Sequence, residues 1–194
     1  AFFSIEIGKN SLFERLAGKF CNIKIAQLRD GYFSKVQYQK FIQPTLEKLQ
    51  KSALYIDDTP AIDIEEICRR TRRLHKELSQ TGINLKLLAI DYFQLIKWAP
   101  KDTNHILGKL RELAQELQIA VLISVQCKQQ FTGSPSNLLD LLPASMQIFF
   151  NELLIFIQKT QRENELYIVF HSKRSIRTQL NVHFNQECGI ITDK

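Results

Sequence analysis

Apolar residues in the first part of the chain occur in two alternating patterns. Short continuous apolar runs, closed by polar or turn-forming residues, predict buried strands at 1–7, 53–56, 85–90 and 119–125. Apolar residues that recur every three or four positions, with charges between them, predict amphipathic helices at 63–80 and 104–117. This strand–helix rhythm is typical of an α/β fold in which helices flank a mostly parallel sheet.

Residues 8–50 predict two further helices between the first two strands. The first follows Gly8, and Asn10 and Ser11 are residue types suited to cap its N-terminus. The second covers about residues 34–49. Pro44 lies inside it and predicts a kink or a break, because proline lacks the N–H group that the helix ladder needs.

The C-terminal part of the chain changes character. Apolar segments follow one another there without helices between them, at 152–158, 165–171, 179–184 and 189–192. These segments predict antiparallel strands that complete the parallel sheet at its C-terminal end. The apolar stretch 138–150 has no clear assignment. Because no repeat or low-complexity tract divides the chain, we expect a single domain over residues 1–194.

Composition narrows the class of protein. The chain is 44% hydrophobic and 24% charged, which is ordinary for a globular protein, and no apolar run approaches the length of a membrane span. The four cysteines are far apart and form no C-x-x-C pair, so a cytoplasmic, reducing setting is expected and a zinc site is not. The apolar start at Ala1 suggests a chain cut out of a longer one.

Basic residues exceed acidic ones by 26 to 20, and this net charge of +6 permits a polyanionic partner without requiring one. The densest cluster is Arg69, Arg70, Arg72 and Arg73. These arginines can line a nucleic-acid channel or a subunit interface. They can also form a solvated helix face paired with nearby glutamates, and this second interpretation is favoured.

Three polar residues, Glu6, Asp91 and Gln126, stand at the carboxyl ends of predicted strands. Ligands of open parallel sheets bind in the crevice outside these ends. A carboxylate there can hold a magnesium ion or polarise water, and an amide can sense a γ-phosphate. Each residue can also be polar simply because the chain leaves the core at that point. All three in this order favour a nucleotide site.

The local sequences sharpen this hypothesis. The run LLAIDYFQLI at 87–96 resembles the Walker B segment of DnaB-family replicative helicases. FFSIE at 2–6 resembles the family's second strand, and ISVQ at 123–126 resembles its sensor strand. The segments between them, LRDG at 28–31, LYIDDTP at 54–60 and RRTRRL at 69–74, match in order and spacing.

The resemblance implies the second half of a RecA-like ATPase domain. It implies Glu6 as the base that activates water, Asp91 as the magnesium-associated carboxylate and Gln126 as the sensor. It implies ATP and Mg²⁺ as cofactors. The implied partners are single-stranded DNA and other helicase subunits in a hexameric ring, without a membrane. The implied activity is 5′→3′ unwinding of DNA in replication.

Several features depart from the family pattern. No G-x-x-x-x-G-K-[ST] phosphate loop occurs in the 194 residues, so we expect no ATPase activity from this chain alone. The late Lys-x-Arg finger that acts in trans has only Lys173 and Arg174 as its nearest counterparts. In the shortened loop after the Walker B segment, Lys97 and Lys101 are the candidate contacts to DNA phosphates. Trp98 beside them either stacks on a base or covers apolar surface.

Two functions therefore remain open. The chain is part of an ATP-driven helicase motor whose phosphate loop lies upstream. Alternatively it is a non-catalytic, DnaB-like remnant that binds DNA or a helicase subunit through its basic surface.

Overall fold

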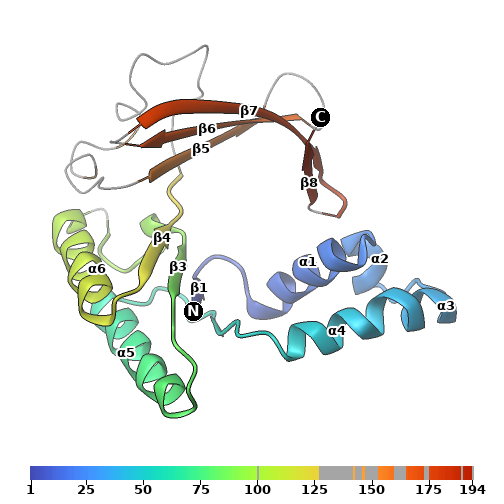
Figure 1. Cartoon of the computed structure of the whole chain (residues 1–194), viewed down its shortest axis with the longest axis horizontal. Coiled ribbons are helices and arrows are strands. Elements are labelled where there is room, and N and C mark those ends of the chain that lie inside the picture. The colour runs from blue at the N-terminus through green and yellow to red at the C-terminus, as the bar shows by residue number, and fades with distance from the viewer. Residues whose placement is uncertain are drawn as a thin grey trace. The chain divides into compact units, whose positions relative to one another are not determined.

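The computed structural model describes residues 1–99, 101–126, 142, 146, 153–159, 165–172, 175–188 and 190–193. These residues form two compact units (Figure 1). The first unit comprises residues 1–9 and 54–126 together with Leu142 and Met146. The second comprises residues 10–53 and the described residues from 153 onward. No helix in this described part of the chain combines the length and the apolar character that crossing a membrane requires.

The first unit contains a four-stranded sheet with the order β2-β1-β3-β4, and every neighbouring pair is parallel. Its strands are β1 (Phe2–Ser4), β2 (Ile56–Asp57), β3 (Leu87–Asp91) and β4 (Ala120–Ile123). The four predicted strands are confirmed, but each is shorter than its apolar run. The first strand ends at Ser4 rather than at Glu6, because the chain turns where the Ser4 hydroxyl donates to the carbonyl of Ile7 at 2.5 Å.

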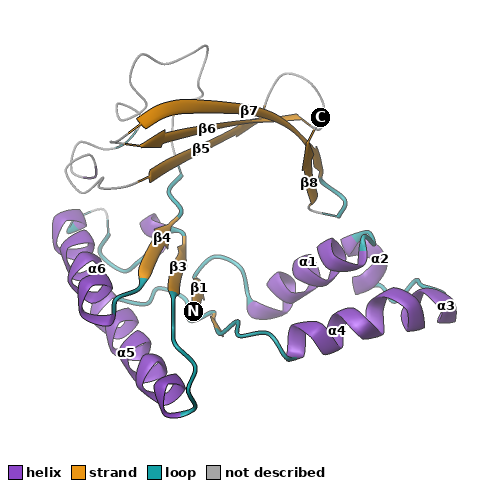
Figure 2. Ribbon diagram, viewed as in Figure 1, coloured by secondary structure: helices purple, strands orange, loops and turns teal. Residues whose placement is uncertain are grey.

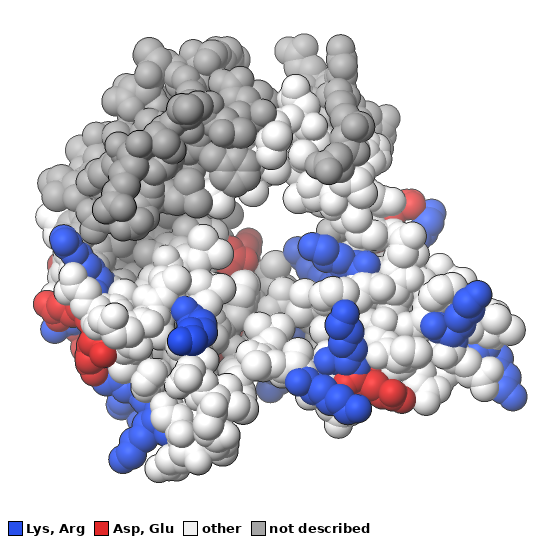
Figure 3. Space-filling model, viewed as in Figure 1, with Lys and Arg blue, Asp and Glu red and all other residues white. Residues whose placement is uncertain are grey.

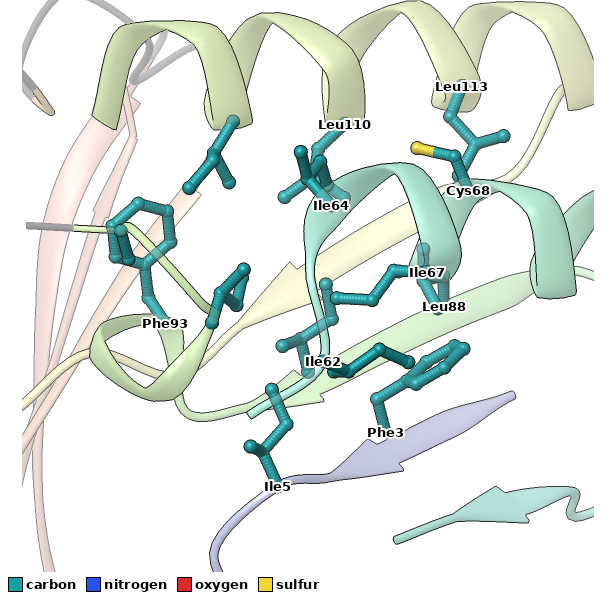
Figure 4. Packing of buried hydrophobic residues seen from close by; sticks show 14 of the residues in the cluster. Phe3, Ile5, Ile62, Ile64, Ile67, Cys68, Leu88, Phe93, Leu110 and Leu113 are labelled. Carbon is teal, nitrogen blue, oxygen red and sulfur yellow. The ribbon is translucent and has the colours of Figure 1, made fainter. Parts of the chain in front are cut away.

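Two long helices cover one face of this sheet, α5 (Ile64–Gln80) and α6 (Thr103–Leu117) (Figure 2). The Asp63 carboxylate accepts the backbone N–H of Glu66 at 2.8 Å, which caps α5 at its predicted start. Figure 4 shows how side chains of both helices pack onto strands β1 and β3. The labelled members are Phe3, Ile5, Ile62, Ile64, Ile67, Cys68, Leu88, Phe93, Leu110 and Leu113.

The two faces of the sheet differ in burial. Leu88 and Ile90 of β3 lie on the helix-covered face and are fully buried. On the opposite face, Leu87 is 45% exposed and Leu122 of β4 is 54% exposed. The prediction of a third strand buried along its whole length is therefore wrong at Leu87. A continuous apolar run does not by itself tell whether both faces of a strand are covered.

The second unit begins with a helical segment. Its helices are α1 (Lys9–Cys21), α2 (Ile25–Arg29), α3 (Lys35–Gln37) and α4 (Gln43–Gln50). The predicted N-cap at Asn10 or Ser11 is wrong, because α1 already begins at Lys9. The predicted irregularity near Pro44 is confirmed as a π-helical turn, Tyr38–Ile42, that joins α3 to α4. Pro44 itself occupies the first turn of α4, where a missing N–H costs little.

The rest of the second unit is an antiparallel sheet with the order β5-β6-β7-β8. Its strands are β5 (Leu153–Lys159), β6 (Glu165–Ser172), β7 (Ser175–Asn185) and β8 (Ile190–Asp193). The expected antiparallel strands are confirmed, but the expectation that they complete the parallel sheet is wrong, because within the described residues they pair only with one another and form a separate sheet. Lys24 of the helical segment forms a 2.8 Å ion pair with Glu187, so the helical segment and this sheet belong to one unit.

Candidate functional site

The carboxyl ends of β1, β3 and β4 bring the three predicted site residues to one edge of the parallel sheet. Asp91 ends the middle strand, next to Ser4 of β1 in the strand register. The Ile5 N–H donates to the carbonyl of Asp91 at 2.9 Å, so the chain that leads to Glu6 continues along Asp91. On the other side, the Ser124 N–H donates to the carbonyl of Ile90 at 3.0 Å and guides the chain toward Gln126.

Glu6 lies on an anchored turn between β1 and α1. Its side chain is exposed, whereas Ser4 before it is buried and holds the turn through its bond to Ile7. At the far end of the turn, the Lys9 N–H donates to the carboxylate of Asp58 at 2.8 Å. The Glu6 carboxylate is therefore presented to solvent from a backbone that is fixed on both sides.

Asp91 is held by a neighbour on the adjoining strand end. The Ser124 hydroxyl donates to Oδ1 of Asp91. This bond occupies one carboxylate oxygen, and within the described residues no hydrogen bond engages the second, Oδ2. Ser124 belongs to the segment ISVQ that resembles the sensor strand, but nothing in the sequence predicts its hydrogen bond to Asp91.

Gln126 is braced by a second glutamine. The Gln94 side chain donates through Nε2 to the carbonyl of Gln126 at 2.8 Å, and its Oε1 accepts the Gln126 N–H at 3.3 Å. One amide side chain thus pairs with both backbone groups of residue 126, as a neighbouring strand would. Gln94 sits on a short 3-10 turn, Phe93–Leu95, whose Phe93 N–H donates to the carbonyl of Ser124 at 2.9 Å.

The described residues contain no group of three or more His, Cys, Asp or Glu side chains that could hold a metal ion by themselves. Asp91 supplies one carboxylate and Ser124 one hydroxyl at the strand edge. A site of this kind suits Mg²⁺, which keeps several waters and is bound through one or two carboxylates plus phosphate oxygens. The residues present fit the metal only together with a phosphate ligand.

The loop after the Walker B-like segment forms a tight turn. The Ala99 N–H donates to the carbonyl of Ile96 at 3.0 Å, and both of these residues are buried. Lys97 and Trp98 occupy the two central positions, and Lys101 follows in the exposed part of the loop. Trp98 is 60% exposed, so the alternative in which its ring covers apolar surface is not supported.

The arginine cluster of α5 is paired with carboxylates, as the favoured interpretation predicted. Arg69 and Arg70 both contact Glu66 at 2.6 Å, and their hydrogen bonds lower the pKa of Glu66 to about 2. Arg72 donates to Glu116 of α6 at 2.7 Å, and that hydrogen bond lowers the pKa of the Glu116 carboxyl. On the face shown in Figure 3, basic side chains lie among acidic and uncharged ones rather than in one continuous patch.

Arg70 also ties the helix to the end of β2. Its guanidinium donates to Asp57 and to the hydroxyl of Thr59, each at 2.7 Å. Burial would raise the pKa of Asp57, but the hydrogen bonds from Arg70 and Thr59 outweigh it and lower that pKa. These contacts give the arginine a role in holding the loop 57–60, which carries Asp58.

Lys173 and Arg174, the predicted counterparts of the finger that acts in trans, lie outside the described residues. The strands on either side of them, β6 and β7, are described. Their assignment therefore stays a prediction.

Comparison with known protein sequences finds similarity to replicative DNA helicases. The family described as DnaB-like helicase C terminal domain matches residues 1–137. The chain is 32% identical over 126 residues to the replicative DNA helicase DnaB of Nostoc sp., covering 63% of this chain and 14% of that protein. It is 33% identical over 129 residues to the replicative DNA helicase DnaC of Bacillus subtilis, covering 63% and 27%. With DnaB of Rickettsia typhi the identity is 36% over 129 residues, covering 62% and 24%.

Two solved structures share the fold over 100% of this chain. One, described as an ATPase domain, superposes with a TM-score of 0.81 at 19% identity, and 73% of that chain is covered. A DnaB-like replicative helicase, described with its interactions with primase, gives 0.80 at 18% identity, and 50% of that chain is covered. At these identities the likeness supports the fold alone, a RecA-like sheet with helices and a smaller antiparallel sheet. The chain spans about a quarter or less of the length of the curated relatives.

Proposed function

Because the chain belongs to the family of DnaB-like helicase C-terminal domains, we propose that it is part of a replicative helicase that uses ATP to unwind duplex DNA with 5′→3′ polarity. The observation that supports this proposal is that the strands that Glu6, Asp91 and Gln126 end or follow, β1, β3 and β4, are neighbours in one parallel sheet. Ligands of open parallel sheets bind at this edge.

Each residue has a role that suits its surroundings. Glu6, exposed on its anchored turn, is the base that takes a proton from the attacking water. Asp91 would hold a magnesium ion through its carboxylate, one oxygen of which accepts the hydroxyl of Ser124. Gln126 presents its amide to the γ-phosphate from a backbone braced by Gln94. ATP, when bound, would supply the phosphoanhydride bond whose hydrolysis drives movement along DNA.

The remaining parts of the proposal follow from the family. Lys173 and Arg174 reach the nucleotide of a neighbouring subunit, and Lys97 and Lys101 contact phosphates of single-stranded DNA. The subunits assemble into a hexameric ring in the cytoplasm. The chain is one partial RecA-like domain, and residues 1–194 by themselves turn over no ATP, because they contain no phosphate loop.

A second candidate function is favoured by two departures from the family pattern, at the Lys-x-Arg finger and in the shortened loop after the Walker B segment. In that case the chain is a non-catalytic, DnaB-like module that binds DNA or a helicase subunit, and the strand-edge residues are inherited without use.

The experiment that separates the two candidates is Mg-ATP hydrolysis by the complete reading frame that contains this chain, with and without single-stranded DNA. We expect DNA-stimulated turnover that Asp91→Asn abolishes. Asp102→Asn is the matched control, because Asp102 is exposed and its side chain makes no capping bond to α6. DNA binding without turnover in the unaltered protein would favour the non-catalytic module and would remove Glu6 and Asp91 from any catalytic role.

A further inference from the structure

We propose that Trp98 is a stacking platform for a base of single-stranded nucleic acid, and that Lys97 and Lys101 bind the adjoining phosphates. This inference rests on the proposed function, because it names the strand contact of the same helicase domain. It adds an aromatic contact to the two phosphate contacts expected from the lysines.

The ring of Trp98 does not contribute to the core. It is 60% exposed, whereas Ile96 and Ala99, the residues that anchor the turn, are buried. An exposed tryptophan leaves a large apolar surface in water, which is unfavourable unless another molecule covers it. Ile96 and Ala99 already anchor the turn in the core, so the turn does not need the Trp98 ring for its packing.

The backbone at Trp98 also adopts a conformation that favours glycine. Its φ is +69°, in the left-handed region, at the third position of the turn closed by the Ala99 N–H and the Ile96 carbonyl. Glycine is the preferred residue at this position of such a turn, and a bulky side chain there is strained. The Trp98 carbonyl accepts two N–H groups, from Lys101 at 2.9 Å and from Asp102 at 3.0 Å, and these bonds hold the strained residue in place.

The two lysines of this loop, Lys97 and Lys101, keep their charges available. Lys97 places its ammonium 5.4 Å from the centre of the Trp98 ring, as a cation–π contact. Within the described part of the chain, neither Lys97 nor Lys101 has an ion-pair partner, whereas Arg69, Arg70 and Arg72 of α5 all do. The charge that a phosphate can meet is therefore at this turn rather than on the arginine-rich helix.

The chemistry of the turn selects a single strand. An aromatic ring stacks on a base only if the face of that base is free, and a duplex covers both faces of its bases. An ammonium group next to the ring is suited to the phosphate of the same nucleotide. The Trp98 ring and Lys97 on one short turn, with Lys101 shortly after it, thus match a nucleotide unit with an unstacked base.

The chain carries its own reporter for a test, because Trp98 is its only tryptophan. Titration of the chain with a thymidine oligonucleotide of roughly 15 nucleotides should quench the tryptophan emission in a saturable manner. The same sequence in a duplex should not. A saturating oligonucleotide that leaves the emission unchanged, or an affinity too weak to measure, would overturn the proposal.

Variants give the second readout, the anisotropy of a labelled oligonucleotide. Trp98→Ala should weaken binding by about 5- to 140-fold, which is 1–3 kcal/mol per stacked base at 1.4 kcal/mol per factor of ten. Trp98→Phe should retain part of the affinity, because phenylalanine also stacks. Tyr32→Ala is the matched control, because Tyr32 is an exposed aromatic residue of the second unit. Equal affinity of Trp98→Ala and the unaltered chain would overturn the proposal.

Trp98→Gly separates binding from folding. Glycine suits the left-handed backbone, so this variant should fold at least as stably as the unaltered chain while it loses the stacking contact. If Trp98→Gly bound the oligonucleotide as tightly as the unaltered chain, the stacking role would be refuted. Failure of the helicase assignment has a different signature: the complete reading frame would show no ATP turnover, while tryptophan quenching and the Trp98→Ala loss would remain.

Discussion

Arg70 and Arg73 lie one turn apart on α5, and the structure gives them different surroundings. The Arg70 side chain is 28% exposed and donates to Asp57, Thr59 and Glu66 at 2.6–2.7 Å. The Arg73 side chain is 62% exposed, and Glu77, its partner, is 3.7 Å away. A hydrogen bond to a charged group contributes about 1.5–3 kcal/mol, and solvent screening reduces this at partly exposed sites. We therefore expect Arg70→Gln to lower the free energy of unfolding by about 2 kcal/mol.

The same reasoning makes Arg73→Gln the matched control. An exposed i,i+4 ion pair contributes about 0.3–0.5 kcal/mol, so this variant should lose no more than that. Urea denaturation of the two variants measures the difference as a shift of the midpoint. With a slope of about 2 kcal/mol per molar urea, the midpoint should fall by about 1 M for Arg70→Gln and by about 0.2 M for Arg73→Gln.

Two results would refute this assignment of the arginines. Equal midpoint shifts would show that the network around Asp57 contributes no more than a surface ion pair. A several-fold loss of oligonucleotide affinity in Arg73→Gln would show that the cluster meets nucleic acid despite its carboxylate partners. Asp57→Asn, combined with Arg70→Gln in a double-mutant cycle, isolates the interaction between these two side chains.

Three further predictions concern stability and the anchored turn. The pKa of Glu66 is about 2 in the folded chain, well below its ordinary value near 4.5. Its contribution is therefore complete above pH 4.5 and is lost as the pH falls toward 2, so acid titration should narrow the stability gap between Glu66→Gln and the unaltered chain. Asp58→Ala removes the acceptor of the Lys9 N–H, which should cost about 1 kcal/mol and speed hydrogen exchange at that amide, while Asp58→Asn should retain an acceptor. Leu110→Ala empties a fully buried position and should cost about 2–5 kcal/mol in urea denaturation.

Much of the fold could be predicted because its signals are local. Helix α5 combines a capping aspartate, Asp63, with apolar residues at helical spacing, and both features lie within a few turns of chain. The start of α1 could not be predicted in the same way. Its first N–H is satisfied by Asp58, which is 49 residues away in the sequence, so Asn10 and Ser11 are not needed as caps. The long-range contact outweighs the local preference.

The candidate site shows the same division. The apolar runs predicted strands that end near Glu6, Asp91 and Gln126, but which strands are neighbours comes only from the strand order β1-β3-β4 in the structure. Their anchoring residues had no comparable signal. Gln94 bonds to Gln126 across 32 residues, and Ser124 bonds to Asp91 across 33. Such bonds depend on the strand register, which apolar patterns leave open.

Net charge is a poor guide to where a polyanion binds, because it counts paired and unpaired groups alike. In this chain the densest basic cluster belongs to α5, yet Arg70 and Arg72 are already paired with Asp57, Glu66 and Glu116. A phosphate that displaced one of these carboxylates would gain one ion pair and lose another. Lys97 and Lys101 face no such exchange within the described residues, so each can neutralise a phosphate and release counterions on binding. Replacing both by glutamine should reduce the slope of log affinity against log salt by about 1.4 for a single strand, whereas replacing Arg73 should leave that slope unchanged.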